Sequence, residues 1–271
     1  MRRARDTGGF SLLEALVALL LVSIVLAGAV GAFATQTRSY RQQDLTTATQ
    51  QNLRVAMGMV VDALRSGGYG APDGDLSAWV PWVSGFASSP MITGTAPMTV
   101  SVASCFQAPL ATLSAAVTGG ATILSVATDI PGQSIPDLLN RTTMSLILVG
   151  DSENAQVTNV TESALAIDTD PNTVGTQGLA RGYPAGTPIC RVDVHTFSIS
   201  TDTITGVSWM AIDADQGAGP QPAIDGISHL TVTAVAAHQY QVTLTARSES
   251  IDPMTQLYVT RSLSSNVTLR N

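Results

Sequence analysis

The feature that most constrains this chain is an apolar run of 24 residues, Phe10 to Phe33, which contains one ionisable side chain. As an α-helix that rises 1.5 Å per residue, the run is about 36 Å long, and the hydrocarbon core of a membrane is about 30 Å thick. Residues 1–9, which precede it, are polar and carry three arginines. Positive charge holds the adjoining end of a spanning helix in the cytoplasm. We therefore predict a single membrane-spanning helix with a short basic leader on its cytoplasmic side.

A cleaved secretory signal peptide is the alternative to a spanning helix. Ala32-Phe33-Ala34 has the small-x-small form of a signal peptidase site, which would release an exported protein beginning at Thr35. The apolar run is longer than the 7 to 15 residues usual for a signal peptide. Moreover, Glu14 lies inside it, where an ionised carboxylate costs about 2.5 to 3.5 kcal/mol near the bilayer centre. Glu14 therefore requires a partner that neutralises it.

The start of the run has a recognisable pattern. Gly9-Phe10-Ser11-Leu12-Leu13-Glu14 and the apolar residues after it resemble the leader and N-terminal helix of type IV prepilins. In that family, a prepilin peptidase cuts after the glycine and methylates the new amine. The resemblance implies cleavage between Gly9 and Phe10, N-methylation of Phe10, and a role for Glu14 in assembly. Its carboxylate would lie one helical turn from the new ammonium and could neutralise it within a subunit or between neighbours.

The helical pattern continues beyond the membrane run, because the first proline is Pro72. Five apolar residues recur on one helical face, which indicates packing against a folded head. They are Leu53, Met57, Val60, Val61 and Leu64. The sequence predicts one helix from Phe10 to Ser66, in which residues 10–33 form the membrane and assembly segment and residues 34–66 form its amphipathic continuation. Gly67-Gly68 supplies the stop.

The rest of the chain, residues 67–271, has the pattern of a β-rich head. Short β-branched runs alternate with turn residues, and residues 90–185 approximately could form an inserted β-subdomain. The predicted strands are Met98–Val102, Thr122–Val126, Ser145–Val149, Gln156–Val160, Val192–Ser200, Val207–Ile212, Ile227–Ala236, Tyr240–Ala246 and Val259–Leu269. The predicted fold class is α+β, with the long helix packed on an antiparallel sheet.

Three later segments narrow the resemblance. Leu53–Tyr69 is similar to the end of the long helix in PilW-type minor pilins, and Asp225–Val232 and Val242–Ser248 resemble strands of those proteins and of the J-type pseudopilins of type II secretion. The resemblance implies a type IV pilin fold and a structural or assembly-initiating subunit of a type IV pilus. It also implies an inner-membrane protein with a periplasmic head that later joins the filament, with prepilin peptidase, other pilins and the inner-membrane assembly platform as partners. A J-type pseudopilin and a filament-displayed adhesin or DNA-uptake component remain alternatives.

The charge and cysteine content of the chain argue against a nucleic-acid-binding protein and a zinc-binding module. The net charge is −7 and all 13 basic residues are arginine, which does not suggest a nucleic-acid partner, because nucleic-acid binders carry basic patches. Cys105 and Cys190 lie too far apart for a zinc module and have no further ligands at zinc spacing. In an exported chain, we expect them to form one disulfide.

No catalytic motif accompanies the three histidines, so we predict that the chain is not an enzyme. The histidines are His195, His229 and His238, and we expect the first two to be ordinary strand residues with polar partners. Four acidic pairs have the ligand type that calcium takes, but none has EF-hand spacing, so we expect turn carboxylates and neither a metal nor a cofactor. The pairs are Asp73/Asp75, Asp151/Glu153, Asp168/Asp170 and Asp213/Asp215. Trp79, Trp82 and Phe86 form either an exposed contact or a loop folded over the head's core.

Overall fold

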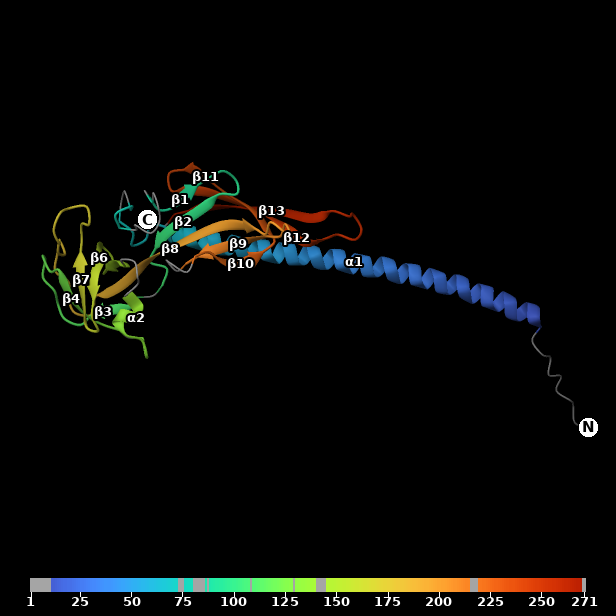
Figure 1. Cartoon of the computed structure of the whole chain (residues 1–271), viewed down its shortest axis with the longest axis horizontal. Coiled ribbons are helices and arrows are strands. Elements are labelled where there is room, and N and C mark those ends of the chain that lie inside the picture. The colour runs from blue at the N-terminus through green and yellow to red at the C-terminus, as the bar shows by residue number, and fades with distance from the viewer. Residues whose placement is uncertain are drawn as a thin grey trace, which may run out of the picture.

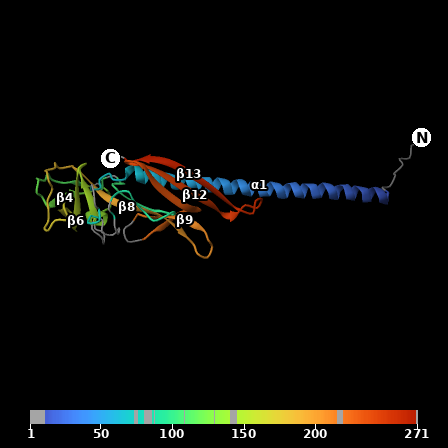
Figure 2. The same cartoon turned by 90° about the horizontal axis from the view of Figure 1, so that it is seen from above.

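The structure is a computed structural model that describes residues 11–72, 76–79, 86, 88–107, 109–128, 130–139, 145–214 and 219–269. One long helix, α1 (Leu12–Ser66), carries a β-rich head on its C-terminal half, and a second β-rich unit lies beyond its C-terminal end (Figures 1 and 2). The molecule therefore has an α+β, pilin-like layout. We call the two β-rich parts the head and the distal unit.

Helix α1 divides into an exposed half and a packed half. Every residue from Ser11 to Arg38 is exposed, whereas one face of the later turns is buried. The five apolar residues predicted for that face are all at most 6% exposed, which confirms the predicted face. The helix begins at Leu12 rather than at Phe10, because Ser11 takes an extended conformation and serves as the N-cap; Phe10 itself lies outside the described residues.

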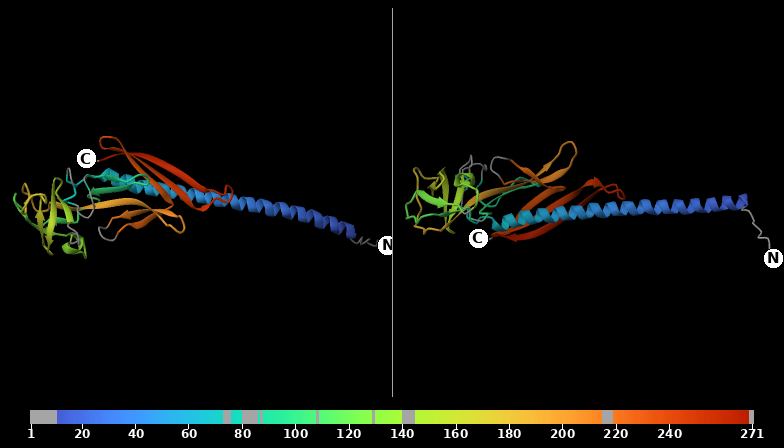
Figure 3. Two further views of the ribbon diagram at one scale, coloured as in Figure 1. Left: turned by 45° about the horizontal axis from the view of Figure 1, so that its top comes forward. Right: turned by 90° about the horizontal axis from the view of Figure 1, so that it is seen from below.

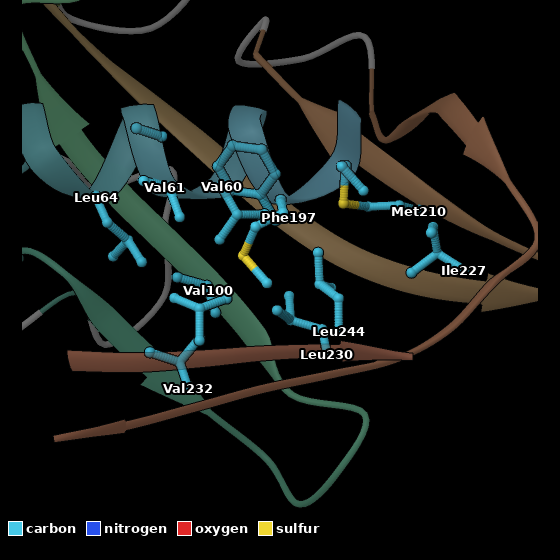
Figure 4. Close-up of a cluster of buried hydrophobic side chains, with 14 of the residues drawn as sticks. Val60, Val61, Leu64, Val100, Phe197, Met210, Ile227, Leu230, Val232 and Leu244 are labelled. Carbon is cyan, nitrogen blue, oxygen red and sulfur yellow. The ribbon is translucent and has the colours of Figure 1, made fainter. Parts of the chain in front are cut away.

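The head packs two sheets against the buried face of α1. The first contains β1 (Met91–Thr93), β2 (Thr99–Ser104), the second part of β8 (Pro188–Thr201), β9 (Ser208–Asp213) and β10 (Gln221–Asp225). The second contains β11 (Ile227–Ala236), β12 (Gln239–Ile251) and β13 (Tyr258–Thr268), all antiparallel. Side chains from α1 and from both sheets point toward one another in a single core (Figure 4). Burial of this core fixes the helix on the head.

Gly226 joins the two sheets of the head. Its N–H donates to the Ser208 carbonyl oxygen at 2.8 Å, and its own carbonyl oxygen accepts from the Arg247 N–H at 2.7 Å. The residue has φ +78°, and a Cβ added to it would lie 2.8 Å from the Arg247 carbonyl oxygen. Only glycine combines this left-handed conformation with so close a backbone approach.

The distal unit is a ring of strands closed on itself. It contains β3 (Ala111–Leu113), β4 (Ile123–Ala127), β5 (Ser145–Val149), β6 (Glu153–Val160), β7 (Ala164–Asp168), the first part of β8, and the short helix α2 (Ile135–Leu139). The strand order is β8-β3-β4-β7-β6-β5, and β5 pairs with β8 again. The ring encloses an apolar core of its own, so the distal unit does not depend on α1 for burial.

The predicted insert of residues 90–185 differs from the distal unit at both ends. Strands β1 and β2 fall within that range but pair in the head beside α1, and the distal unit takes its last strand from beyond residue 185. The reason is β8, which pairs with β5 through Ile189–Val192 and with β2 through Asp193–Phe197. Several elements have no counterpart among the predicted strands, including β1, β3, β10 and the short helix α2.

Candidate functional site

The candidate site is the N-terminal turn of α1, where Glu14 closes a capping box with Ser11. The Ser11 hydroxyl oxygen accepts from the Glu14 N–H at 3.2 Å, and Glu14 Oε2 accepts from the Ser11 N–H at 3.3 Å and from its hydroxyl at 3.4 Å. Two of these three bonds engage the backbone N–H groups of Ser11 and Glu14, which have no partner within the first helical turn. The carboxylate also lies at the positive end of the helix dipole. Glu14 is therefore held against the backbone of the residue two positions after Gly9.

In the sequence, this carboxylate lies close to the predicted processing point between Gly9 and Phe10. Gly9 and Phe10 lie outside the described residues, so cleavage and methylation there remain predictions. Phe10 is bonded to the nitrogen of Ser11, and that N–H donates to Glu14. If Phe10 becomes the N-terminal residue, its amine is one residue along the backbone from the N–H that donates to Glu14. The next acidic residue along the chain is Asp44, so no other carboxylate in α1 can neutralise it within the first eight turns.

An unbroken apolar surface surrounds the site. Large side chains such as Leu12, Leu13 and Phe33 are 83%, 73% and 74% exposed, and none of the apolar window of α1 is buried against the described chain. Within the described residues, α1 is the one helix long and apolar enough to span a membrane. The helix continues through Gly28 and Gly31, where an added Cβ would meet nothing within 4 Å. Such a surface is stable in lipid or against other apolar helices, and small residues allow close helix contact.

The two cysteines lie at the base of the distal unit. Cys105 follows β2, where the chain leaves the head, and Cys190 lies in β8, where the chain returns. The structure joins them in a disulfide across 85 residues of sequence, with Cα atoms 6.0 Å apart. The bond therefore closes the chain segment that forms the distal unit.

The histidines occupy three different environments. His195 in β8 stacks on Phe106, with ring centroids 3.9 Å apart; burial lowers its pKa, and the nearby Asp193 carboxylate acts in the opposite direction. His229 is exposed, with Nδ1 3.3 Å from the Ser228 hydroxyl. His238 lies in the turn between β11 and β12. In the part of the chain that the structure describes, no three His, Cys, Asp or Glu residues are grouped as metal ligands would be.

The acidic pairs that the structure describes accept hydrogen bonds from the protein. Asp168 Oδ1 accepts from the N–H groups of Asp170 and Gln177, at 3.0 and 3.2 Å, and Asp151 Oδ1 accepts from the Tyr69 hydroxyl at 3.4 Å. Glu153 Oε2 accepts from the Tyr183 hydroxyl at 3.0 Å. Asp73, Asp75 and Asp215 lie outside the described residues. Asp151, Glu153 and Asp168 thus order the turns and side-chain contacts around them.

The aromatic segment is folded over the core. Trp79 is 8% exposed and Phe86 is fully buried, and they pack with Leu76, Leu148 and Cys190. For these two aromatic residues, the interpretation as a loop over the core is confirmed. Trp82 lies outside the described residues.

Sequence reasoning missed a buried ion pair between the head and the distal unit. Arg191 and Asp193 in β8 are 7% and 2% exposed. Arg191 donates from Nε and Nη2 to the two Asp193 carboxylate oxygens at 2.8 and 3.0 Å, and from Nη1 to the Leu138 carbonyl oxygen of α2 at 2.6 Å. Residues two apart share one face of a strand, which is the signal that could have found the pair.

A comparison with protein families matches residues 4–30 to the prokaryotic N-terminal methylation motif. The match covers the end of the leader, the capping box and most of the apolar run. Comparisons with curated proteins and with solved structures found no match.

Proposed function

Because the methylation motif indicates a prepilin-like substrate of the type IV pilin and pseudopilin class, we propose that this protein is a minor pilin, a structural or assembly-initiating subunit of a type IV pilus. The observation that carries the proposal is the division of α1. One continuous helix offers an exposed apolar half with a single carboxylate and buries its other half in the head. The same helix can therefore anchor the subunit in a membrane and then pack among other pilin helices.

The position of the distal unit favours an initiating role. It lies beyond the C-terminal end of α1, on the side away from the apolar half (Figures 1 and 3). In a filament of parallel helices to which subunits are added at the membrane, this is the space toward the distal tip, where the head of a preceding subunit would sit. A subunit with an additional folded unit there fits best at the tip.

The proposed course of events follows from the two ends of the apolar run. The basic leader stays in the cytoplasm, prepilin peptidase cuts after Gly9 and methylates Phe10, and the head waits in the periplasm. The subunit then leaves the inner membrane at the assembly platform and joins other pilins through its helix. Neither a cofactor nor a nucleic acid enters the proposal.

The N-terminus of the mature protein tests this proposal. We expect intact mass and N-terminal sequencing to show a chain that begins at N-methylated Phe10. Gly9→Val should leave the precursor uncut. The matched variant Gly8→Val should still be processed, because Gly8 is one residue removed from the peptide bond that is cut. A mature chain that begins at Met1 or at Thr35 would contradict the proposal, since either start lacks the processed helix.

A filament-displayed binding protein is the second candidate, and the self-contained core of the distal unit favours it. Replacing residues 107–187 by a short linker removes that core but keeps β1, β2 and the Cys105–Cys190 disulfide. Deleting the broader range 90–185 would also remove β1, β2 and Cys105. For an initiating subunit, we expect filament number on the cells to fall. Normal filaments with lost surface adhesion or DNA uptake would instead identify a binder. Electron microscopy and adhesion or uptake assays separate the two.

A further inference from the structure

The hairpin that joins β12 and β13 extends along α1 toward the apolar half of the helix (Figures 1 and 3). We call its loop, residues 252–257, with the flanking Ile251 and Tyr258, the hairpin tip. Gln42 Nε2 donates to Asp252 Oδ2 at 3.0 Å and so ties the tip to the helix. Asp252 also accepts from the Met254 N–H at 2.8 Å and from the Thr255 hydroxyl at 2.9 Å. These bonds lower the pKa of Asp252 and hold the loop in one shape.

The hairpin tip exposes apolar side chains although turns are usually polar. Ile251, Met254, Leu257 and Tyr258 are 47%, 51%, 68% and 40% exposed. The polar groups of the loop are used internally, because the Asp252 N–H donates to the Leu257 carbonyl oxygen and the Gln256 N–H donates to the Asp252 carbonyl oxygen, both at 2.9 Å. The large side chains that the tip leaves exposed are therefore apolar or aromatic, beside the polar side chains of Thr255 and Gln256.

The tip lies close to the height of the membrane surface. Gln42 is nine residues beyond Phe33, the end of the apolar run, which is about 13 Å along a helix. The headgroup layer occupies about 5 to 7 Å outside each face of the hydrocarbon core. The apolar run is longer than the core is thick, and a spanning helix accommodates such an excess by tilting. A tilt toward the hairpin lowers the tip onto the headgroups.

The helix between the tip and the apolar run has the residues of a membrane interface. Arg38 is exposed and lies one turn before Gln42 on the same helical face, and Tyr40 and Arg41 are exposed on α1 between them and beside them. No acidic residue lies between Glu14 and Asp44. Tyrosine is enriched at lipid headgroups, and arginine extends its guanidinium to them. The charge complements anionic phosphates.

We propose that the hairpin tip and Arg38 form a lipid-docking surface, by which the head rests on an anionic membrane before assembly. The inference rests on the proposed membrane anchor, with which the surface is continuous. Docking holds the head in one orientation at the membrane and tilts α1 toward the hairpin. Leaving the membrane then requires the tip to separate from lipid before the helix is withdrawn.

Fluorescence quenching in vesicles tests the inference. The full chain is reconstituted in phosphatidylethanolamine and phosphatidylglycerol vesicles that contain lipids with a nitroxide on the headgroup. The probe is Met254→Trp, and its matched control is Val235→Trp, an exposed position at the other end of the β11–β12–β13 sheet. We expect the nitroxide to remove most of the fluorescence that Met254→Trp adds and to leave the fluorescence added by Val235→Trp. Equal quenching at both positions overturns the docking.

Further measurements separate the possible failures. Leu26→Trp, in the apolar run, should be quenched by nitroxide on the acyl chains. If it is quenched and Met254→Trp is not, the docking is wrong and the anchor stands; if Leu26→Trp is not quenched, the anchor and the docking both fail. Quenching at Met254→Trp should weaken with Arg38→Gln or in phosphatidylcholine vesicles, and unchanged quenching overturns the part assigned to Arg38. If Met254→Trp is not quenched and its emission changes when the protein is diluted, a second copy of the chain covers the tip. That result also overturns the lipid docking.

Discussion

Replacing Glu14 by alanine is expected to leave cleavage after Gly9 intact and to abolish incorporation of the protein into filaments. Without the carboxylate, the ammonium created at Phe10 has no counter-charge within the apolar half of α1, and an unpaired charge among apolar helices costs several kcal/mol. The fraction of mature protein that is recovered in sheared filaments, measured by immunoblot, checks the loss. Incorporation equal to wild type would show that Glu14 has no such role.

The capping box provides controls that separate charge from helix capping. Glu14→Gln keeps a side chain that can accept from the Ser11 N–H but removes the charge, so we expect it to be as defective as alanine. Ser11→Ala removes the capping hydroxyl and keeps the carboxylate, so we expect nearly normal incorporation. The reverse pattern would assign Glu14 to capping rather than to charge.

The second large effect is on stability: Asp193→Ala is expected to destabilise the protein by about 3 to 5 kcal/mol. The change leaves the Arg191 guanidinium buried without its carboxylate, while its remaining bond to the Leu138 carbonyl oxygen cannot neutralise it. Denaturant unfolding of the full chain in detergent measures the loss as a lower midpoint.

A paired substitution serves as the control. Arg191→Met combined with Asp193→Leu replaces both charges by apolar side chains, which is often neutral or stabilising for a buried pair. The Leu138 carbonyl oxygen loses one hydrogen bond, which costs about 1 kcal/mol. The double variant should therefore be more stable than Asp193→Ala alone. A single variant that unfolds at the wild-type midpoint would show that the pair is not needed.

Local pattern was sufficient to predict most elements of the head. The predicted strands Val192–Ser200 and Val207–Ile212 correspond to the paired strands β8 and β9, and Ile227–Ala236 and Tyr240–Ala246 correspond to β11 and β12. The apolar period of α1 identified its buried face before any partner was known. These predictions succeeded because each depends on neighbours a few residues away.

Pairings between distant segments could not be predicted in the same way. The closure of β5 on β8, the bond from Arg191 to Leu138 and the contact between Gln42 and Asp252 join residues up to 210 positions apart. Nothing in the local sequence fixes such partners. At the candidate site, sequence reasoning identified Glu14 through the prepilin resemblance, and the structure added its capping partner Ser11.

Strand β8 gives the molecule a mechanical property. Its 14 residues run without a break from the distal unit into the head, and they are hydrogen-bonded to neighbouring strands in both. Antiparallel ladder bonds lie perpendicular to the strand, so a pull along β8 loads many of them at once in shear instead of opening them one after another. Tension applied to the distal unit therefore passes into the head along a continuous backbone, and through the head's core into α1.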